Sequence, residues 1–293
     1  MSPTDFRPDG FFASRNLSPG LQLFTLGQDA LRDLEPTLRR VAAIGYRSVE
    51  LPGVKAGAGR GIRAAAAAAG LTVTGVHVQA GPTLGGMNLT LVDAPGRIAE
   101  ELHALDCSDV ILPFPVVPPP PAVPAERMAE TVCRMFAEGG ADLWKRTAAL
   151  LNERSEALRR EGLSLGYHNH NLEFLPVGDT RGWEILMAEL DPSVTLEVDA
   201  GWVAAAGIDL ASFFDGLRGR VRQLHVKDIQ RARPGTALQT ECTEIGSGIV
   251  DWNRVLPAAY RAGARHYVVE QEAPFSIDRF DAIQKSLDYL CQA

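Results

Sequence analysis

The stretch Leu163-Ser164-Leu165-Gly166-Tyr167-His168-Asn169-His170-Asn171-Leu172-Glu173-Phe174 joins an apolar run to two imidazoles, two amides and a carboxylate. If residues 163–170 form a strand, alternate side chains share a face, so His168 and His170 point the same way and Glu173 lies just beyond the strand. A parallel strand delivers polar groups to a site in this manner, although the end of a surface hairpin could carry the same residues. The ends of the other strands decide between these alternatives.

Seven further stretches read as strands, at residues 21–26, 46–51, 71–78, 109–113, 194–199, 221–227 and 265–272. Helical patterns separate them at residues 28–43, 62–69, 94–105, 125–160 with a break near Gly139-Gly140, 183–190, 210–217 and 252–262. Alternating strands and helices, without a G-x-G-x-x-G after the first strand, predict one closed (β/α)8 barrel rather than a doubly wound sheet. We expect residues 1–20 to form a leader that caps one end, and residues 113–124 to form a stiff proline-rich loop.

Composition narrows the class of protein. The chain has 293 residues, of which 46% are hydrophobic and 22% charged, and this suits a single large domain with a substantial core. The formal charge of -7 argues against a nucleic-acid surface. Four widely spaced cysteines without a C-x-x-C pair suit free thiols in a reducing compartment. With no secretory signal and no apolar run of roughly 18 residues, we expect a cytoplasmic protein that does not enter a membrane.

Polar side chains gather where the predicted strands end. The active site of such a barrel is built at the carboxyl ends of its strands, so these residues are the candidates for function. They are Glu50, His77, Gln79, His168, His170, Glu173, Glu197, Asp199, Gln223, His225, Lys227, Asp228, Glu270 and Glu272.

Four of these residues come from successive late strands and form a plausible metal site: Glu173, Asp199, His225 and Glu270. Three carboxylates and one imidazole suit Mn²⁺ or Mg²⁺, and the nitrogen also admits Co²⁺, Zn²⁺ or Fe²⁺. Mn²⁺ is our first choice. Without a cation the clustered carboxylates would repel one another, which itself favours a bound ion.

The chain resembles the xylose-isomerase-like TIM-barrel superfamily of sugar phosphate isomerases and epimerases along nearly its whole length. The resemblance is carried by residues 20–26, 45–51, 167–174, 199–202, 205–209, 225–228, 244–252 and 269–272, in that order. It implies metal ligands Glu, Asp, His and Glu from successive late strands, which correspond to Glu173, Asp199, His225 and Glu270. The ligand from the strand at 163–170 varies in position within that superfamily, so His168 or His170 could replace Glu173.

Four other residues are candidates for substrate binding, each with a structural alternative. His77 could contact substrate or lie in the core, and Glu50 could orient substrate or pair with Arg47 or Lys55. Lys227 could offer its cation to a substrate oxygen or form a salt bridge with Asp228. Trp202 could form an apolar wall for a sugar ring or serve packing alone.

A metal with open positions could chelate an α-hydroxy-ketone and acidify the neighbouring C–H, so that deprotonation gives an enediolate. The resemblance implies that the paired glutamates, Glu173 and Glu270, remove and return the proton. His168 or His170 could carry protons between substrate oxygens. We therefore expect a metal-dependent isomerase or epimerase of a sugar or keto-sugar, with homo-oligomers common among similar proteins. The alternatives are a lyase, either an inosose-type dehydratase or a 3-keto-glycoside-cleaving enzyme, and a sugar-binding protein without catalysis.

Overall fold

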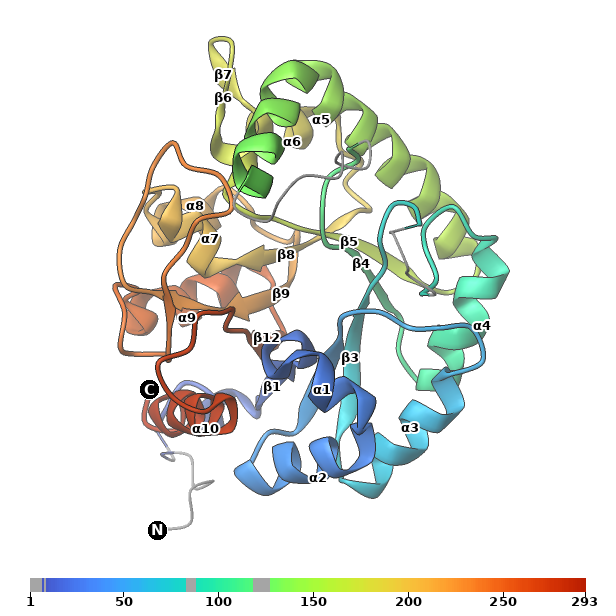
Figure 1. The fold of residues 1–293 in the computed structure, drawn as a ribbon, viewed down its shortest axis with the longest axis vertical. Coiled ribbons are helices and arrows are strands. Elements are labelled where there is room, and N and C mark those ends of the chain that lie inside the picture. Colours follow the sequence, from blue (N-terminus) through green and yellow to red (C-terminus); the bar gives the residue numbers. More distant parts are fainter. Residues whose placement is uncertain (1–6, 8, 83–87, 118–126) are drawn as a thin grey trace.

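Eight parallel strands close into a barrel with helices around the outside (Figure 1). The computed structural model describes residues 7, 9–82, 88–117 and 127–293. Around the barrel the strands follow the order β1-β12-β9-β8-β5-β4-β3-β2, and β1 closes the ring by pairing with β12 and β2. The eight strands are β1 (Pro19–Gln22), β2 (Ser48–Leu51), β3 (Thr72–His77), β4 (Asp109–Leu112), β5 (Ser164–His168), β8 (Thr195–Asp199), β9 (Val221–Val226) and β12 (His266–Val269). The predicted (β/α)8 barrel is confirmed.

Helices follow the strands and cover their outer surface. They are α1 (Gly27–Arg32), α2 (Leu34–Ile44), α3 (Gly59–Ala68), α4 (Pro95–Leu105), α5 (Met128–Arg160), α6 (Gly182–Glu189), α7 (Ala200–Ala205), α8 (Leu210–Asp215), α9 (Trp252–Ala262) and α10 (Arg279–Leu290). The predicted break in the long helix is present, because Gly140 has φ 49° and ψ -146° inside α5. Sequence analysis did not predict α10, which lies beside the described part of the leader and near the C-terminus (Figure 1).

Short strands and 3₁₀ turns lie outside the eight barrel strands in the described part of the chain. Two antiparallel pairs are formed by β6 (Pro176–Val177) with β7 (Thr180–Arg181) and by β10 (Asp228–Ile229) with β11 (Cys242–Thr243). The 3₁₀ turns are η1 (Ala13–Arg15), η2 (Leu23–Leu26) and η4 (Leu172–Phe174).

The first strand is shorter than predicted and ends at Gln22. Its side chain accepts a hydrogen bond of 3.1 Å from the Phe24 backbone N–H, which caps η2 and turns the chain out of the sheet. The prediction of a strand over residues 21–26 was therefore wrong over residues 23–26. An apolar sequence continues there because Leu23 and Leu26 are still buried in the core.

The described part of the leader packs against the final strand. Phe11 and Phe12 each place their ring edge on Tyr267, at centroid distances of 5.3 and 5.5 Å. The backbone N–H of Phe11 also donates to the carbonyl of Ala293, so the leader is tied to the last residue. Residues 118–124 of the predicted proline-rich loop lie outside the described residues.

No disulfide joins the four cysteines, all of which lie in the described ranges. None of the helices in those ranges is both long enough and apolar enough to cross a membrane.

Candidate active site

Four neighbouring strands bring four metal-ligating side chains together at the carboxyl end of the barrel. His168 ends β5, Asp199 ends β8, His225 lies one residue before the end of β9, and Glu270 directly follows β12. One ligand atom from each lies within 4.8 Å of all the others. All four side chains are buried. We call these four residues the rim group.

The sheet register fixes this arrangement. Asp199 is paired directly with His225 across β8 and β9, and the Glu270 backbone N–H extends the ladder by donating to the Val226 carbonyl at 3.2 Å. Within the rim group, the Nδ1 of His225 lies 3.0 Å from Glu270 Oε2 and 3.8 Å from Asp199 Oδ2. The Nε2 of His168 lies 4.0 Å from the same Asp199 oxygen.

These distances fit a divalent ion. An ion with bonds of about 2.1 Å holds its ligand atoms about 3 to 4 Å apart. Two imidazole nitrogens and two carboxylate oxygens form a donor set that transition-metal ions bind readily. The structure is thus consistent with a divalent metal held by the rim group.

Lys227 is the cation that faces the two rim carboxylates. Its fully buried ammonium lies 2.8 Å from Asp199 Oδ2, 2.9 Å from Glu270 Oε2 and 2.7 Å from Glu272 Oε1. Burial alone would lower the pKa of Lys227, but these carboxylates raise it well above its ordinary value. Burial would likewise raise the pKa of Glu270, but Lys227 and His225 hold it well below its usual range. The charges at the rim therefore depend on one another.

Lys227 forms salt bridges as its structural alternative predicted, but with partners other than Asp228. The Asp228 carboxylate instead accepts from the backbone N–H groups of Gly246, Gly248 and Val250 and from Trp252 Nε1. Asp228 therefore organises the loop before α9.

Glu173 is buried beside the rim group but is not part of it. Its Oε1 accepts from the Tyr167 hydroxyl at 2.6 Å, and its Oε2 accepts from the His170 backbone N–H at 3.0 Å. Burial raises the pKa of Glu173 to about 7. Among the described residues, both groups able to hold a metal include His168 and leave out Glu173. His168, which sequence analysis named as a possible replacement for Glu173, is the member of the rim group that comes from β5.

The second of these groups lies on the other side of the same two histidines. It consists of His77, His168, Glu197 and His225. Glu197 Oε1 lies 2.9 Å from His77 Nε2, 2.9 Å from His168 Nδ1 and 3.1 Å from His225 Nε2. We call these residues, together with Glu50, the floor group.

Glu50 and His77 point into the barrel. Glu50 Oε2 lies 2.7 Å from His225 Nε2 and 3.2 Å from His77 Nε2, and it also accepts from Gln22 Nε2 at 2.6 Å. Glu50 is fully buried. The predicted alternative of a pair with Arg47 or Lys55 is therefore wrong, because the carboxylate faces the interior histidines.

Burial and the neighbouring charges shift the pKa values within the floor group in different directions. Burial would lower the pKa of His77, but the carboxylates of Glu50 and Glu197 raise it to about 10. Burial and then the charge of Glu50 raise the pKa of Glu197 to about 8. Burial, followed by the neighbouring charge of His225, lowers the pKa of His168 well below its ordinary value, so its ring is neutral near pH 7.

His170 and Trp202 form an aromatic wall next to the rim group. The His170 ring lies 5.0 Å from His168, 5.2 Å from Trp202 and 5.3 Å from Phe114 between centroids. In the described part of the chain, His170 Nδ1 and Trp202 Nε1 are buried without a hydrogen-bond partner. The Lys227 ammonium lies 5.1 Å from the Trp202 ring centroid.

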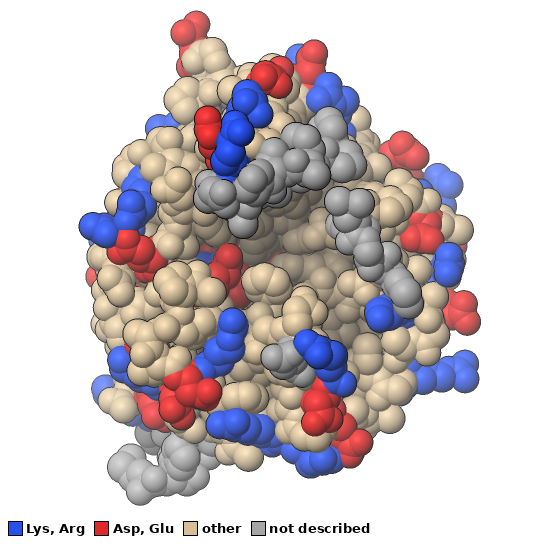
Figure 2. Space-filling model, viewed as in Figure 1, with Lys and Arg blue, Asp and Glu red and all other residues tan. Residues whose placement is uncertain are grey.

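The face of the molecule drawn in Figure 2 is hollowed near its centre, and atoms of Asp or Glu residues are visible beside the hollow.

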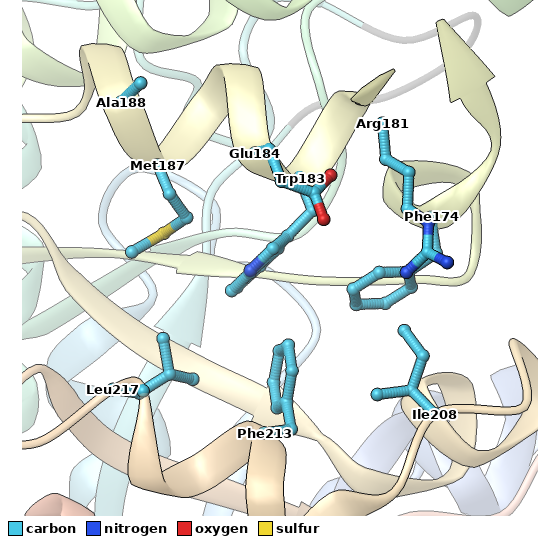
Figure 3. Close-up of a pocket in the computed structure, with 10 residues that line it drawn as sticks. Phe174, Arg181, Trp183, Glu184, Met187, Ala188, Ile208, Phe213 and Leu217 are labelled. Atoms are coloured by element: carbon cyan, nitrogen blue, oxygen red, sulfur yellow. The ribbon is translucent and has the colours of Figure 1, made fainter. Parts of the chain in front are cut away.

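A separate cavity of about 500 Å³ lies between α6 and α8 (Figure 3). Phe174, Trp183, Met187 and Phe213 point into it, and the lining includes none of the ten predicted site residues. The predicted site residues therefore lie outside this helical layer.

Sequence analysis noticed Glu197 at a strand end but gave it no role. The signal was present, because Glu197 lies two residues before Asp199 and so shares its face of the strand. Gln22 could not be recognised as a residue at a strand end, because the first strand was predicted to continue to residue 26.

Comparison with known proteins places the chain in a family. No curated protein sequence matches it. A sugar phosphate isomerase/epimerase from Parabacteroides distasonis ATCC 8503 is 23% identical, with a TM-score of 0.71 over 94% of this chain and 93% of that chain. An L-ribulose 3-epimerase is 12% identical, with a TM-score of 0.63 over 93% of each chain.

A probable 3-DHS dehydratase, AsbF from Bacillus anthracis, is 13% identical, with a TM-score of 0.62 over 94% of this chain and 98% of that chain. At these identities the likenesses establish the fold alone. The model of one protein family, however, matches residues 38–293 of this sequence. The chain therefore belongs to the xylose isomerase-like TIM barrel family.

Proposed function

We propose that the protein is a divalent-metal-dependent enzyme that isomerises or epimerises a sugar or keto-sugar through an enediolate. The observation that carries the proposal is the convergence of His168, Asp199, His225 and Glu270 at the carboxyl end of the barrel. A barrel of this kind builds its active site there. The sugar isomerase and epimerase names of two structural neighbours support the same class of substrate.

The proposed ligands are His168 Nε2, Asp199 Oδ2, His225 Nδ1 and Glu270 Oε2. With two nitrogens in the set, Mn²⁺, Fe²⁺, Co²⁺ and Zn²⁺ fit better than Mg²⁺, which prefers oxygen ligands. When bound, such an ion polarises the substrate carbonyl and makes the neighbouring C–H more acidic. Lys227 would keep Asp199 and Glu270 in place through its contacts with both carboxylates.

Glu270 and His170 are the groups that we assign to proton movement. The Glu270 carboxylate is ionised beside Lys227, so it can accept the proton that leaves the substrate carbon. Return of that proton to the former carbonyl carbon gives an isomer, whereas an epimer needs a proton delivered to the original carbon from the opposite side by a second group. His170 can pass a proton between substrate oxygens, because its buried Nδ1 has no partner in the described part of the chain.

Trp202 and Lys227 are the groups that we assign to substrate positioning. The Trp202 ring, next to His170, offers an apolar face for one side of a sugar ring. The Lys227 ammonium sits where it can also reach a substrate oxygen near Glu270.

An unphosphorylated substrate agrees best with the loop before α9. Gly246-Ser247-Gly248 is the glycine-rich turn that could have bound a phosphate, but the N–H groups of Gly246 and Gly248 both donate to Asp228 Oδ2. These donors are occupied by an internal carboxylate.

A lyase is the second candidate, because the dehydratase from Bacillus anthracis shares the fold. Elimination needs an acid above the leaving group, and His170 is the nearest free imidazole. Burial, followed by the charge of Lys227, lowers the pKa of His170 to about 3, so the ring is neutral at neutral pH and holds no imidazolium proton for a leaving group. Isomerisation or epimerisation is therefore the first choice.

Incubation of the Mn²⁺-loaded protein with keto-sugars in D₂O tests the proposal. We expect deuterium at the carbon next to the carbonyl together with a new isomer or epimer, and loss of both in Glu270→Gln. Release of water or an aglycone would favour the lyase. No exchange and no product, with sugar binding retained, would favour a binding protein.

A further inference from the structure

In each histidine of the rim group, one ring nitrogen faces the carboxylates of the rim group and the other faces the carboxylates of the floor group. The Nε2 of His168 and the Nδ1 of His225 face the rim carboxylates. The opposite nitrogens, His168 Nδ1 and His225 Nε2, face the carboxylates of the floor group. A neutral imidazole can give only one nitrogen to a metal, and a hydrogen bond at the other nitrogen decides which one.

We propose that Glu197 is a positioning residue, whose carboxylate holds the Nδ1–H of His168 and thereby turns the Nε2 of that ring toward the ion. The inference rests on the proposed metal site and extends it to a residue outside the four ligands.

The contact is built into the barrel by strand register. His168 is paired directly with Glu197 across β5 and β8, so the ladder itself brings His168 Nδ1 within 2.9 Å of Glu197 Oε1. Both side chains are 2% exposed, and water therefore does not compete for this hydrogen bond. The same strand then presents Asp199 two residues later, on the same face.

The histidine nitrogens around Glu197 Oε1 favour this oxygen as a hydrogen-bond acceptor. Besides His168, the ring nitrogens of His77 and His225 approach the same Oε1 atom at 2.9 and 3.1 Å. Both of these rings also face Glu50 Oε2, so each has carboxylates as partners on that side. An oxygen that faces three imidazoles in this manner receives N–H groups, and His168 Nδ1 is one of its donors.

A second ion in the floor group is the competing explanation. Ligand nitrogens would then surround an ion at about 2.1 Å each. Here the common neighbour of the three rings is instead the Glu197 oxygen itself, at hydrogen-bonding distances. We therefore read the floor group as a hydrogen-bonded cluster around Glu197 Oε1, although the other oxygen of that residue, Oε2, has no hydrogen-bond partner among the described residues.

Long-range ¹H–¹⁵N spectra of the metal-free protein with labelled histidine test the proposal directly. Six histidines give a tractable spectrum, and single-residue variants assign the His168 signals. We expect His168 to carry its proton on Nδ1 in the wild type. A proton on Nε2 there would overturn the proposal without any variant of Glu197.

The matched variants are Glu197→Gln and Glu50→Gln. An amide at position 197 no longer requires a proton on His168 Nδ1, so we expect the Nε2–H form to appear. Glu50→Gln should leave His168 unchanged, because no hydrogen bond or ion pair joins these two residues in the described ranges. An unchanged His168 in Glu197→Gln would contradict the inference.

Metal binding gives the second readout. We expect one Mn²⁺ per chain, with an affinity roughly 10- to 100-fold lower in Glu197→Gln. Two ions per chain in the wild type and one in Glu197→Gln would instead establish the second ion. If the wild type binds no divalent ion while His168 still carries its proton on Nδ1, the proposed function fails and the hydrogen-bond assignment stands.

Discussion

Glu173 is the predicted metal ligand whose contacts in the structure differ from those expected from the sequence. Sequence analysis placed it in the metal site because a carboxylate lies just beyond the strand at 163–170. In the structure both oxygens are occupied by Tyr167 and the His170 backbone. A strand pattern cannot reveal this, because the chain leaves β5 at His168 and folds back through η4.

The pKa of Glu173 gives a prediction on stability. Its pKa is raised from 4.5 to about 7 by burial, so the folded chain binds this proton more tightly than the unfolded chain does. The free energy of unfolding should therefore fall as pH rises through that window. This contribution falls by up to about 2.5 kcal/mol between pH 5 and pH 8. The substitution Glu173→Gln removes this pH-dependent contribution to the free energy of unfolding, because an amide does not titrate.

Urea unfolding of the metal-free wild type and Glu173→Gln at both pH values measures the effect. The wild type should lose more stability than the variant between pH 5 and pH 8. Parallel losses would mean that Glu173 is already ionised in the folded chain at pH 5.

At the scale of elements, strand positions could be predicted and strand ends could not. Short apolar runs, some continuous and some alternating, located all eight strands of the barrel, because parallel strands covered by helices bury apolar side chains. Ends depend on side chains that bond to the backbone, such as Gln22 at η2. Asp199 is another such residue. Its Oδ1 accepts from the Trp202 N–H at 2.9 Å and caps α7, while its Oδ2 faces the other members of the rim group.

Asp228 should be a stabilising residue of the loop before α9. Its buried carboxylate accepts four hydrogen bonds from backbone N–H groups and one from Trp252 Nε1. Hydrogen bonds to a charged group contribute about 1.5 to 3 kcal/mol each, and their effects are not additive. We expect Asp228→Ala to lower the free energy of unfolding by at least about 3 kcal/mol, and Asp228→Asn to lose less.

Equilibrium unfolding in urea checks this, with Asp251→Ala as the control on the exposed side of the same loop. A loss in Asp228→Ala no greater than that of the control would show that the loop is held by other contacts.

At the scale of the whole molecule, the barrel explains why residues spread from position 50 to position 270 share one site. Strands β2, β3, β5, β8, β9 and β12 each add one or two side chains, and closure of the barrel brings the strand ends together. The order of the strand ends could be predicted from the sequence, which is why sequence analysis placed Asp199, His225 and Glu270 close together, as they are in the structure. The floor group could not, since its contacts cross the barrel between strands that are distant in sequence, as Glu50 and His225 are.

Metal content per chain is the most direct test of the central claim. The wild type and the variants Asp199→Asn, His168→Gln and Glu173→Gln would be loaded with Mn²⁺, dialysed and analysed by plasma mass spectrometry. We predict one ion in the wild type and in Glu173→Gln, and none in Asp199→Asn or His168→Gln. An ion that is lost in Glu173→Gln but retained in His168→Gln would contradict the rim group, and no ion in the wild type would contradict metal dependence altogether.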